Sequence, residues 1–336
     1  MPSAGRDTSA FRVVLAIFGV WLLWQLRDVA LLLFGAIIVA ALLRAFSDPL
    51  SRGSRLPSRP AVLTVALGLL AILVLIVWSL GEPLAHQLQE LRTALPKAWA
   101  SVREWLERNP LGTKMLEAGD DVARDFVIPW SRLAGAATVA TGAIANIVLI
   151  VLMGVYLALD PGVYLRGLLR LLPPRRRPAF QAAMEASGEG LKKWLLGQGV
   201  AMLMVGLTVG IGLALLGMPL APALGLISGL LEFVPFFGPI ASALLAVLVA
   251  FAQGPQEALY VAIFFVVIQQ LEGNVVIPFV QRWAVHMPPL LSVLAVVVFG
   301  TLFGMAGVVF GTPLMVVTLV LVERLYVRDT LEHHAP

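Results

Sequence analysis

Three glutamates are the only charged residues in a long apolar tract of this chain. Residues 194–281 contain Glu232, Glu257 and Glu272 but no lysine or arginine that could pair with them. A charge at the centre of a membrane helix costs roughly 2.5–3.5 kcal/mol on insertion scales. Glu232 stands next to a helix-breaking Pro-Phe-Phe-Gly-Pro run at residues 235–239. We therefore expect the Glu232 carboxyl group to serve a function, whereas Glu257, beside a glycine and a proline, is expected in a solvated loop.

A second polar group follows at residues 269–274. On a helix, Gln269 and Glu272 lie three residues apart and Gln270 and Asn274 four apart, so each pair shares a face. Oxygen ligands of this kind suit a hard cation or a hydrogen-bonded, polyol-like substrate. A glutamate in such a group can also exchange a proton. The alternative is that the group faces water at the end of a membrane helix, which the basic Arg282 nearby favours.

Two apolar runs in the last third are each interrupted in the middle. The run at 223–252 is broken near residues 235–239, and the run at 290–322 is broken around residues 304–313. Non-helical backbone inside a membrane must be buried in protein or line water, and broken helices are the best sequence pointer to a transport site. Glycines four apart in the second run fit close helix packing equally well. The expected hairpin breaks are Pro235, Gly238, Pro239, Gly304, Gly307 and Pro313.

The composition places these groups in a membrane protein. The chain of 336 residues is 59% hydrophobic and 13% charged, against about 25% charged in soluble domains. The predicted fold class is all-α: a polytopic helical integral membrane protein with two broken-helix hairpins, spanning or re-entrant, in the C-terminal third. Apolar spans are expected at 13–26, 29–43, 61–80, 133–159, 194–217 and 258–271, and as two segments joined by a tight turn at 290–322.

The loop charges predict the topology. Segment 161–193 has seven basic and two acidic residues, and segment 47–60 has three arginines against one aspartate. Segment 82–132 is nearly neutral, with seven basic and eight acidic residues. The positive-inside rule places the two basic segments in the cytoplasm and the neutral one outside. We therefore expect cytoplasmic N- and C-termini.

The apolar spans and the loop charges together divide the chain into six segments. The segment at 82–132, which is expected outside, carries leucines at helical spacing, and these must pack on each other, on the membrane surface or on a neighbouring subunit. Pro96 should kink or split that helix. A second amphipathic stretch is expected at 115–126. The segments are N-terminal spans at 1–81, an extracytoplasmic amphipathic insert at 82–132, a span at 133–160, a basic cytoplasmic helix at 161–193, a transport core at 194–326 and a cytoplasmic tail at 327–336.

Several functions are excluded by missing residue types. The chain has no cysteine, which removes disulfides, thiolate metal sites and cysteine nucleophiles. It lacks a phosphate-binding Gly-x-x-x-x-Gly-Lys loop, a His-Glu-x-x-His helix and a Gly-x-Ser-x-Gly elbow. The net charge of +4 comes from a few arginine clusters and does not indicate nucleic-acid binding. We expect no enzyme, no metal and no cofactor, with H⁺ or Na⁺ as the coupling ion.

Three sequence blocks carry a resemblance to a known family. The run from Gly229 through Glu232 to Pro239, the run from Gln270 to Pro278, and the run from Phe303 to Leu314 are similar to the signatures of the autoinducer-2 exporter family, also called PerM-like permeases. Gly197-Gln198 fits it as well. The resemblance covers nearly the whole chain, although Ile277 and Phe279 replace a charged pair found in many members. This departure, the Pro288-Pro289-Leu290 step and the tail at residues 326–331 resemble a less characterised bacterial subgroup.

The resemblance implies a transporter fold more firmly than a cargo. We expect a bacterial inner-membrane secondary transporter that exports a small polar or amphiphilic solute, such as a furanone-type signal, coupled to protons or sodium. The expected site comprises Glu232, Gln269, Gln270, Glu272 and Asn274 between the two hairpins. The resemblance and the amphipathic insert also imply a homo-oligomer in the lipid bilayer. The alternatives are a sodium–proton antiporter without organic substrate and a structural or scaffolding membrane protein.

Overall fold

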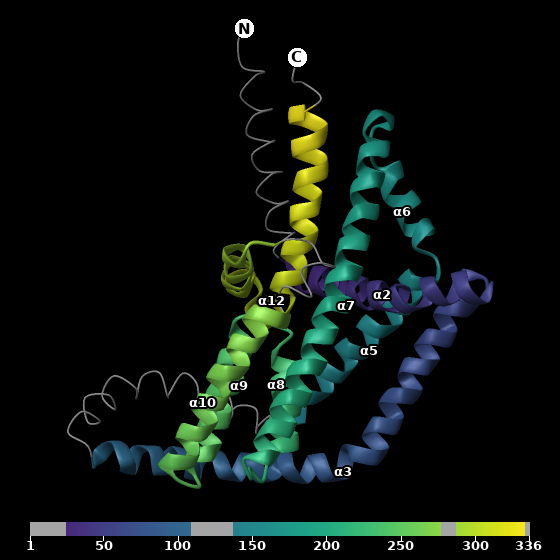
Figure 1. The fold of residues 1–336 in the computed structure, drawn as a ribbon. Coiled ribbons are helices and arrows are strands. Elements are labelled where there is room, and N and C mark those ends of the chain that lie inside the picture. Colours follow the sequence, from purple (N-terminus) through teal and green to yellow (C-terminus); the bar gives the residue numbers. More distant parts are fainter. Residues whose placement is uncertain (1–24, 109–136, 277–286, 333–336) are drawn as a thin grey trace.

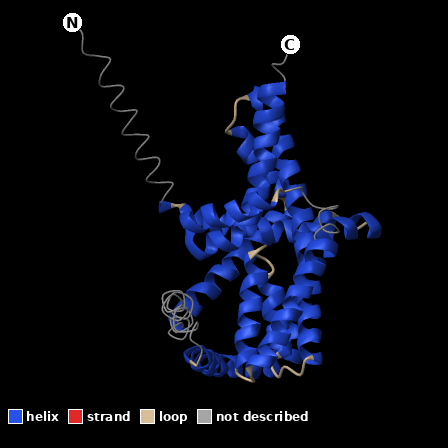
Figure 2. Ribbon diagram, turned by 60° about the vertical axis from the view of Figure 1, so that its left-hand side comes forward, coloured by secondary structure: helices blue, strands red, loops and turns tan. Residues whose placement is uncertain are grey.

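The computed structural model describes residues 25–108, 137–276 and 287–332, and every regular element in these ranges is a helix (Figure 1, Figure 2). The expected all-α class is therefore confirmed. Residues 13–24 of the span predicted at 13–26, the amphipathic stretch at 115–126, and both Pro278 and Arg282 lie outside the described residues.

Helices α2 (Arg27–Ser54) and α5 (Ala137–Leu159) pack side by side and run parallel. A Cβ atom built on Gly154 would lie 2.6 Å from the Cβ of Val39, and one on Gly35 would lie 3.1 Å from the Cδ1 of Ile150. Both glycines thus allow close approach of the two helices. The spans predicted at 29–43 and 133–159 cross in the same direction.

Helix α3 (Ser58–Glu107) combines a predicted span with the predicted outer helix. It continues through Pro83 and Pro96 without interruption, so of the kink or split expected at Pro96 the split does not occur. Figure 1 shows α3 turning sharply between its first part and its second part, which we call the arm (residues 82–107). Proline inside a helix removes one backbone hydrogen bond and favours such a bend.

Part of the leucine face of the arm packs on the same chain. Leu91 is buried in the main hydrophobic cluster, with Leu95 packed against it. Trp105 meets Phe251 edge to face, with ring centroids 5.7 Å apart. The arm therefore crosses helices α8 (Ala221–Leu231) and α9 (Phe237–Phe251) and covers one end of them.

Helix α7 (Arg177–Leu215) joins the predicted basic helix and the following span into one continuous helix. It is reached from α5 through α6 (Pro161–Arg170), which is bent by 85° from the end of α5, and a 3₁₀ turn at Pro174–Arg176. Leu191 and Leu195, near the middle of α7, are buried. The C-terminal π-helical segment η3 (Glu323–Glu332) lies along the first half of α7 (Figure 1).

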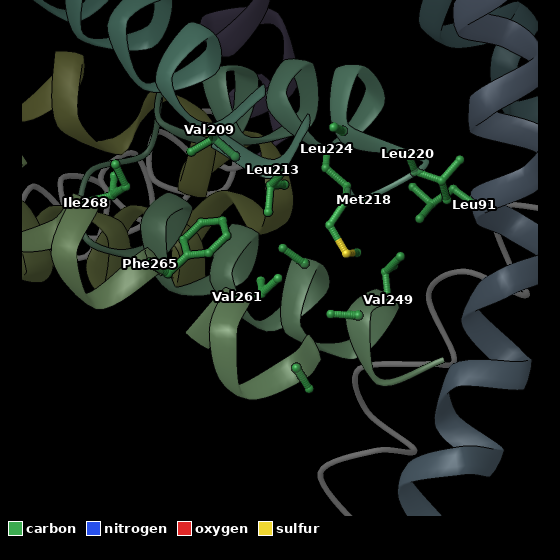
Figure 3. Packing of buried hydrophobic residues seen from close by; sticks show 14 of the residues in the cluster. Leu91, Val209, Leu213, Met218, Leu220, Leu224, Val249, Val261, Phe265 and Ile268 are labelled. Atoms are coloured by element: carbon green, nitrogen blue, oxygen red, sulfur yellow. The ribbon is translucent and has the colours of Figure 1, made fainter. Parts of the chain in front are cut away.

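The main hydrophobic core lies between α7, α8, α9 and α10 (Pro255–Leu271). Figure 3 shows these helices contributing interdigitated aliphatic side chains, together with Leu91 from the arm. Because the core joins four helices that follow each other in sequence, these helices form one packed unit. Its labelled members are Leu91, Val209, Leu213, Met218, Leu220, Leu224, Val249, Val261, Phe265 and Ile268.

Helix α12 (Pro289–Val322) reverses direction inside its own length. Gly304 has non-helical angles of φ 65° and ψ −145°. A Cβ atom built on Gly311 would lie 3.0 Å from the carbonyl oxygen of Ala295, and one on Gly300 would lie 2.9 Å from Val308. These pairs, far apart in a straight helix, converge on Gly304. The two segments predicted at 290–322 are therefore present as a hairpin.

Four helices of the described ranges are long and apolar enough to cross a membrane, or five when α5 and α6 count as one bent span. The α12 segment is one of the four by length, although its backbone folds back at Gly304. Helices α8 and α9 are shorter apolar helices. The protein is thus a multi-pass membrane protein whose α8–α9 and α12 segments are hairpins.

Candidate functional site at the tip of the α8–α9 hairpin

Glu232 lies at the tip of the hairpin formed by α8 and α9. It follows the last residue of α8, and its side chain is only 4% exposed. The chain turns through residues 233–236, where the Gly238 N–H donates to the carbonyl of Val234 at 2.8 Å. A Cβ atom on Gly238 would collide with the carbonyl oxygen of Leu231, so only glycine fits there. The turn closes on itself and holds Glu232 inside the protein.

The backbone at this tip is strained. Phe236 has a φ of 66°, in the left-handed region that L-residues other than glycine and asparagine rarely occupy. Pro235 precedes it and Pro239 falls in the first turn of α9, where a missing N–H costs nothing. Strain of this kind costs of order 1–3 kcal/mol and clusters at ligand sites and switch regions. The tip is therefore a candidate site on its backbone geometry as well as its charge.

A glycine crossing holds α8 against α7. A Cβ atom on Gly225 would lie 2.6 Å from the Cα of Gly210, and one on Gly229 would lie 2.7 Å from the carbonyl oxygen of Met202. Gly206 faces the same contact from α7, with the carbonyl of Gly225 3.2 Å from its built Cβ. Small residues four apart on both helices let the two backbones touch. This crossing fixes where the hairpin tip meets α7.

Gln198 on α7 contacts the tip directly. Its side chain is buried, and its Nε2 donates a hydrogen bond to the backbone carbonyl oxygen of Glu232. That carbonyl lies at the C-terminal end of α8, where helix carbonyls lack intrahelical partners. Trp194, one turn earlier on α7, meets Phe233 edge to face at 5.7 Å between ring centroids. Both α7 side chains therefore position the residues around the Glu232 carboxyl group.

The structure brings Glu272 to Glu232. Glu272 follows the last residue of α10, is half-buried, and has its carboxyl group within hydrogen-bonding reach of the Glu232 carboxyl group. The Oε2 atom of Glu232 is buried and has no hydrogen-bond donor among the residues described. Two carboxylate groups are both acceptors, so a pair in contact needs a proton or a cation between them.

The other residues of the predicted polar group do not join this pair. Gln269, Gln270 and Asn274 are exposed on the chain taken alone. The Nδ2 of Asn274 donates to the backbone carbonyl of Gln270 at 2.8 Å, so these two share a helix face as expected. The Asn274 amide thus makes its hydrogen bond within its own helical segment. A role for these three residues in binding stays a prediction.

The second hairpin approaches the same region through its returning helix. Gly304 forms the turn, whereas Gly307 and Pro313 lie within the returning helix, Gly307 against the Phe299 carbonyl. Val316 belongs to a buried cluster with Trp194, and Phe233 packs against that cluster. We call it the Trp194 cluster; its buried members are Ala41, Leu191, Trp194, Leu195 and Val316. The two hairpins therefore meet at the side of the cluster next to Glu232.

The charges near the pair are unbalanced. The ion pairs found within 25–108, 137–276 and 287–332 include neither Glu232 nor Glu272. In the same ranges no group of three or more His, Asp or Glu side chains has the geometry to hold a metal. Glu257 is placed elsewhere, in the first turn of α10, with its carboxylate against Gly254. The Glu232–Glu272 pair suits binding of a single proton or small cation.

A surface hollow on the arm is not part of this site. It has a volume of about 260 Å³ and is lined by His86, Gln89, Glu90 and Thr93, all from α3. The Nδ1 of His86 lies 3.4 Å from a carboxylate oxygen of Glu90, and both side chains are exposed. Because all four side chains come from one solvated helix, the hollow offers no convergent chemistry.

Two features of the site escaped the sequence reasoning. The glycines at 206 and 210 and those at 225 and 229 form two pairs, each four residues apart, which was a visible signal for close helix packing, but the pairing of the two helices was not. Thr312, beside Pro313, is buried with its Oγ1 unpartnered among the residues described. A lone threonine in an apolar helix gives no sequence signal of this kind.

Comparison with known proteins agrees with this architecture. The family model for "AI-2E family transporter" matches residues 11–326. YueF of Bacillus subtilis (strain 168), a candidate transport protein, is 23% identical over 90% of this chain and 88% of its own length. The candidate transport protein MT0215 of Mycobacterium tuberculosis is 28% identical over 92% of this chain and 88% of its own.

Two further relatives cover less of the chain. The candidate permease PerM of Escherichia coli (strain K12) is 27% identical over 75% of this chain and 74% of its own length. YrrI of Bacillus subtilis is 31% identical, but over 48% of this chain and 46% of its own. The family match spans the bundle, both hairpins and the Glu232 site. The chain belongs to the AI-2E family of transporters, a family of membrane transport proteins and not of enzymes.

Proposed function

We propose that this protein is a secondary transporter that exports a small polar or amphiphilic solute, with the Glu232–Glu272 pair as the proton-carrying group. The observation that supports this most is the buried Glu232 carboxyl group, with an unpartnered oxygen, in contact with a second carboxyl group at a strained hairpin tip. A carboxyl pair of this kind can bind and release one proton with little change in structure. The family resemblance supports a furanone-type signal or a related metabolite as the solute.

A proton suits this pair better than sodium. Sodium is a hard cation and is best held by several oxygen ligands. Here the backbone carbonyl of Glu232 is already occupied by the Gln198 amide, and Asn274 is turned to its own helix. The two carboxyl groups alone can share a proton through a hydrogen bond. The pair therefore offers a proton site without further ligands.

The proposed setting is the bacterial inner membrane with both termini in the cytoplasm. The loop charges support this orientation. It places the Lys192 end of α7 in the cytoplasm and the arm outside, so that the α8–α9 hairpin enters from outside and the α12 hairpin from the cytoplasmic side. Assembly as a homo-oligomer is part of the same proposal, supported by exposed apolar side chains such as Leu88 on the arm.

The test uses the full-length protein in proteoliposomes. Vesicles loaded with a labelled furanone-type signal should lose it faster when a proton gradient is imposed, and a protonophore should remove the stimulation. Protein-free vesicles provide the baseline. If sodium pulses move protons with no organic solute present, the protein is a sodium–proton antiporter and the solute part of the proposal is wrong. If neither solute nor protons move, a scaffolding role replaces transport.

A further inference from the structure

A chain of polar contacts joins α7 to α2 on one side of the Glu232 site. The Lys192 ammonium donates to Asp48 Oδ2 at 2.6 Å and to Glu189 at 2.9 Å. Arg44 contacts the other oxygen of Asp48 at 3.4 Å, and its Nε donates to the carbonyl of Ala158 at 2.7 Å. The side chains of Lys192 and Asp48 are only 19% and 25% exposed. This sheltering reduces screening by water and salt.

The Lys192–Asp48 pair connects two packed units. Helix α2 belongs with α5 and the first part of α3, through the glycine contacts described above and a cluster of Leu43, Val62 and Ala158. Helix α7 belongs with α8, α9 and α10 through the glycine crossing and the main core. Lys192–Glu189, by contrast, stays within α7. Of the two ion pairs of Lys192, the one with Asp48 therefore ties the hairpin-bearing unit to the α2–α5 unit, beside the apolar contact of Ala41 with α7.

The pair lies beyond the Trp194 cluster as seen from Glu232. Lys192 and Gln198 are six residues apart on α7, which is about 9 Å along a helix. Trp194 and Leu195, between them, pack against Ala41 of α2 and Val316 of α12. A layer of apolar side chains and then an ion pair thus separate the Glu232 carboxyl group from the Lys192 end of α7.

Lys192 is charged in this setting. Burial lowers the pKa of its ammonium group, but hydrogen bonds and attraction to Asp48 and Glu189 outweigh burial and leave the pKa raised. The ion pair is therefore intact at neutral pH, and it opens by separation of α2 from α7 rather than by loss of the proton.

We propose that Asp48 and Lys192 form a clasp that closes the Lys192 side of the Glu232 site, and that this clasp must open for the site to reach that side of the membrane. The proposal rests on the proposed transport function, because only a transporter has to expose its site there. Opening separates α2 from α7 and exposes the Trp194 cluster, whereas the contacts inside each unit remain.

The natural absence of cysteine allows a direct test. In full-length protein in inside-out membrane vesicles, Ala41→Cys places one thiol in the Trp194 cluster, and Ala158→Cys places one inside the α2–α5 unit; both positions are buried. The rate of alkylation by a membrane-impermeant maleimide is measured for each. Lys192→Met should speed alkylation at position 41 by about fivefold, the factor that one broken contact of this size gives. Alkylation at position 158 should not change.

Matched variants separate the clasp from general loosening. Glu189→Gln, which leaves the bond to Asp48 in place, and Lys192→Arg should both keep the slow rate at position 41. Asp48→Asn should match Lys192→Met, and the double variant should be no faster than either single one. If Lys192→Met speeds alkylation at both positions through misfolding, the rates measured in Asp48→Asn are the test of the clasp.

An unchanged rate at position 41 in Lys192→Met or Asp48→Asn overturns the clasp. So does an equal rise at both positions in Asp48→Asn. Alkylation needs no transport substrate, so the clasp can fail while transport is observed, or hold while the proposed solute and proton movement is absent.

Discussion

The side-chain oxygen of Gln87, on the arm, accepts a hydrogen bond of 3.0 Å from the backbone N–H of Ala223 in the first turn of α8. The first N–H groups of a helix have no intrahelical partner, and α8 has no capping side chain of its own. The arm thus supplies from a distant segment the cap that the local sequence lacks. It fixes the base of the hairpin whose tip carries Glu232.

Replacing Gln87 should therefore loosen the hairpin at its base. Gln87→Ala leaves the Ala223 N–H without its partner and should cost about 1 kcal/mol of stability. The measurement is the midpoint of thermal unfolding in detergent. Gln89→Ala, on the exposed side of the same arm, is the control and should leave the midpoint unchanged. Equal midpoints for the two variants would show that the cap contributes nothing.

The glycine crossing between α7 and α8 should tolerate no side chain. A methyl group on Gly225 would press on the Gly210 backbone, which cannot move aside, so Gly225→Ala should destabilise the protein by about 1–3 kcal/mol. Gly199→Ala on α7 adds a methyl group in open space and should be neutral or slightly stabilising. Unfolding midpoints of the pair are compared. A loss of the same size in both variants would contradict close packing at Gly225.

The turn of the second hairpin depends on glycine for a different reason. Gly304 has open space around it, but its φ of 65° with ψ −145° is a conformation that is essentially limited to glycine. Gly304→Ala should cost about 1–3 kcal/mol through backbone strain. Gly68→Ala, in the helical part of α3 with open space, is the control. If both variants unfold at the wild-type midpoint, α12 does not turn at Gly304.

The sequence was sufficient to find both glutamates of the pair, because an unpaired charge in an apolar tract is costly wherever the tract folds. The sequence was not sufficient to tell whether Gln269, Gln270 and Asn274 face the glutamate pair or the surroundings, because the direction of a side chain at a helix end depends on the packing of that helix. The hairpin in 290–322 was predictable from length and glycine content, whereas the choice of Gly304 over Gly307 and Pro313 as the turn required the backbone.

Local rules failed where distant contacts decide. Pro96 predicted a kink or a split, yet α3 is not split there, because the residues around it are held on α8 and α9 by Leu91, Leu95 and Trp105. The leucine stripe of the arm was visible as a face that had to be buried. Its partner was not, because the hairpin that it covers lies more than a hundred residues later in the chain.

The most direct test of the account is proton movement through the Glu232 site. Full-length wild-type, Glu232→Gln and Glu257→Gln proteins are reconstituted in liposomes containing a pH-sensitive dye, and an electrical potential is imposed with and without the labelled furanone-type signal outside. Glu257→Gln removes a carboxylate from the same apolar tract but outside the site, and should keep the wild-type proton flux. Glu232→Gln should abolish it, because glutamine cannot exchange a proton. Wild-type proton flux in Glu232→Gln would contradict a proton-carrying role for this carboxyl group.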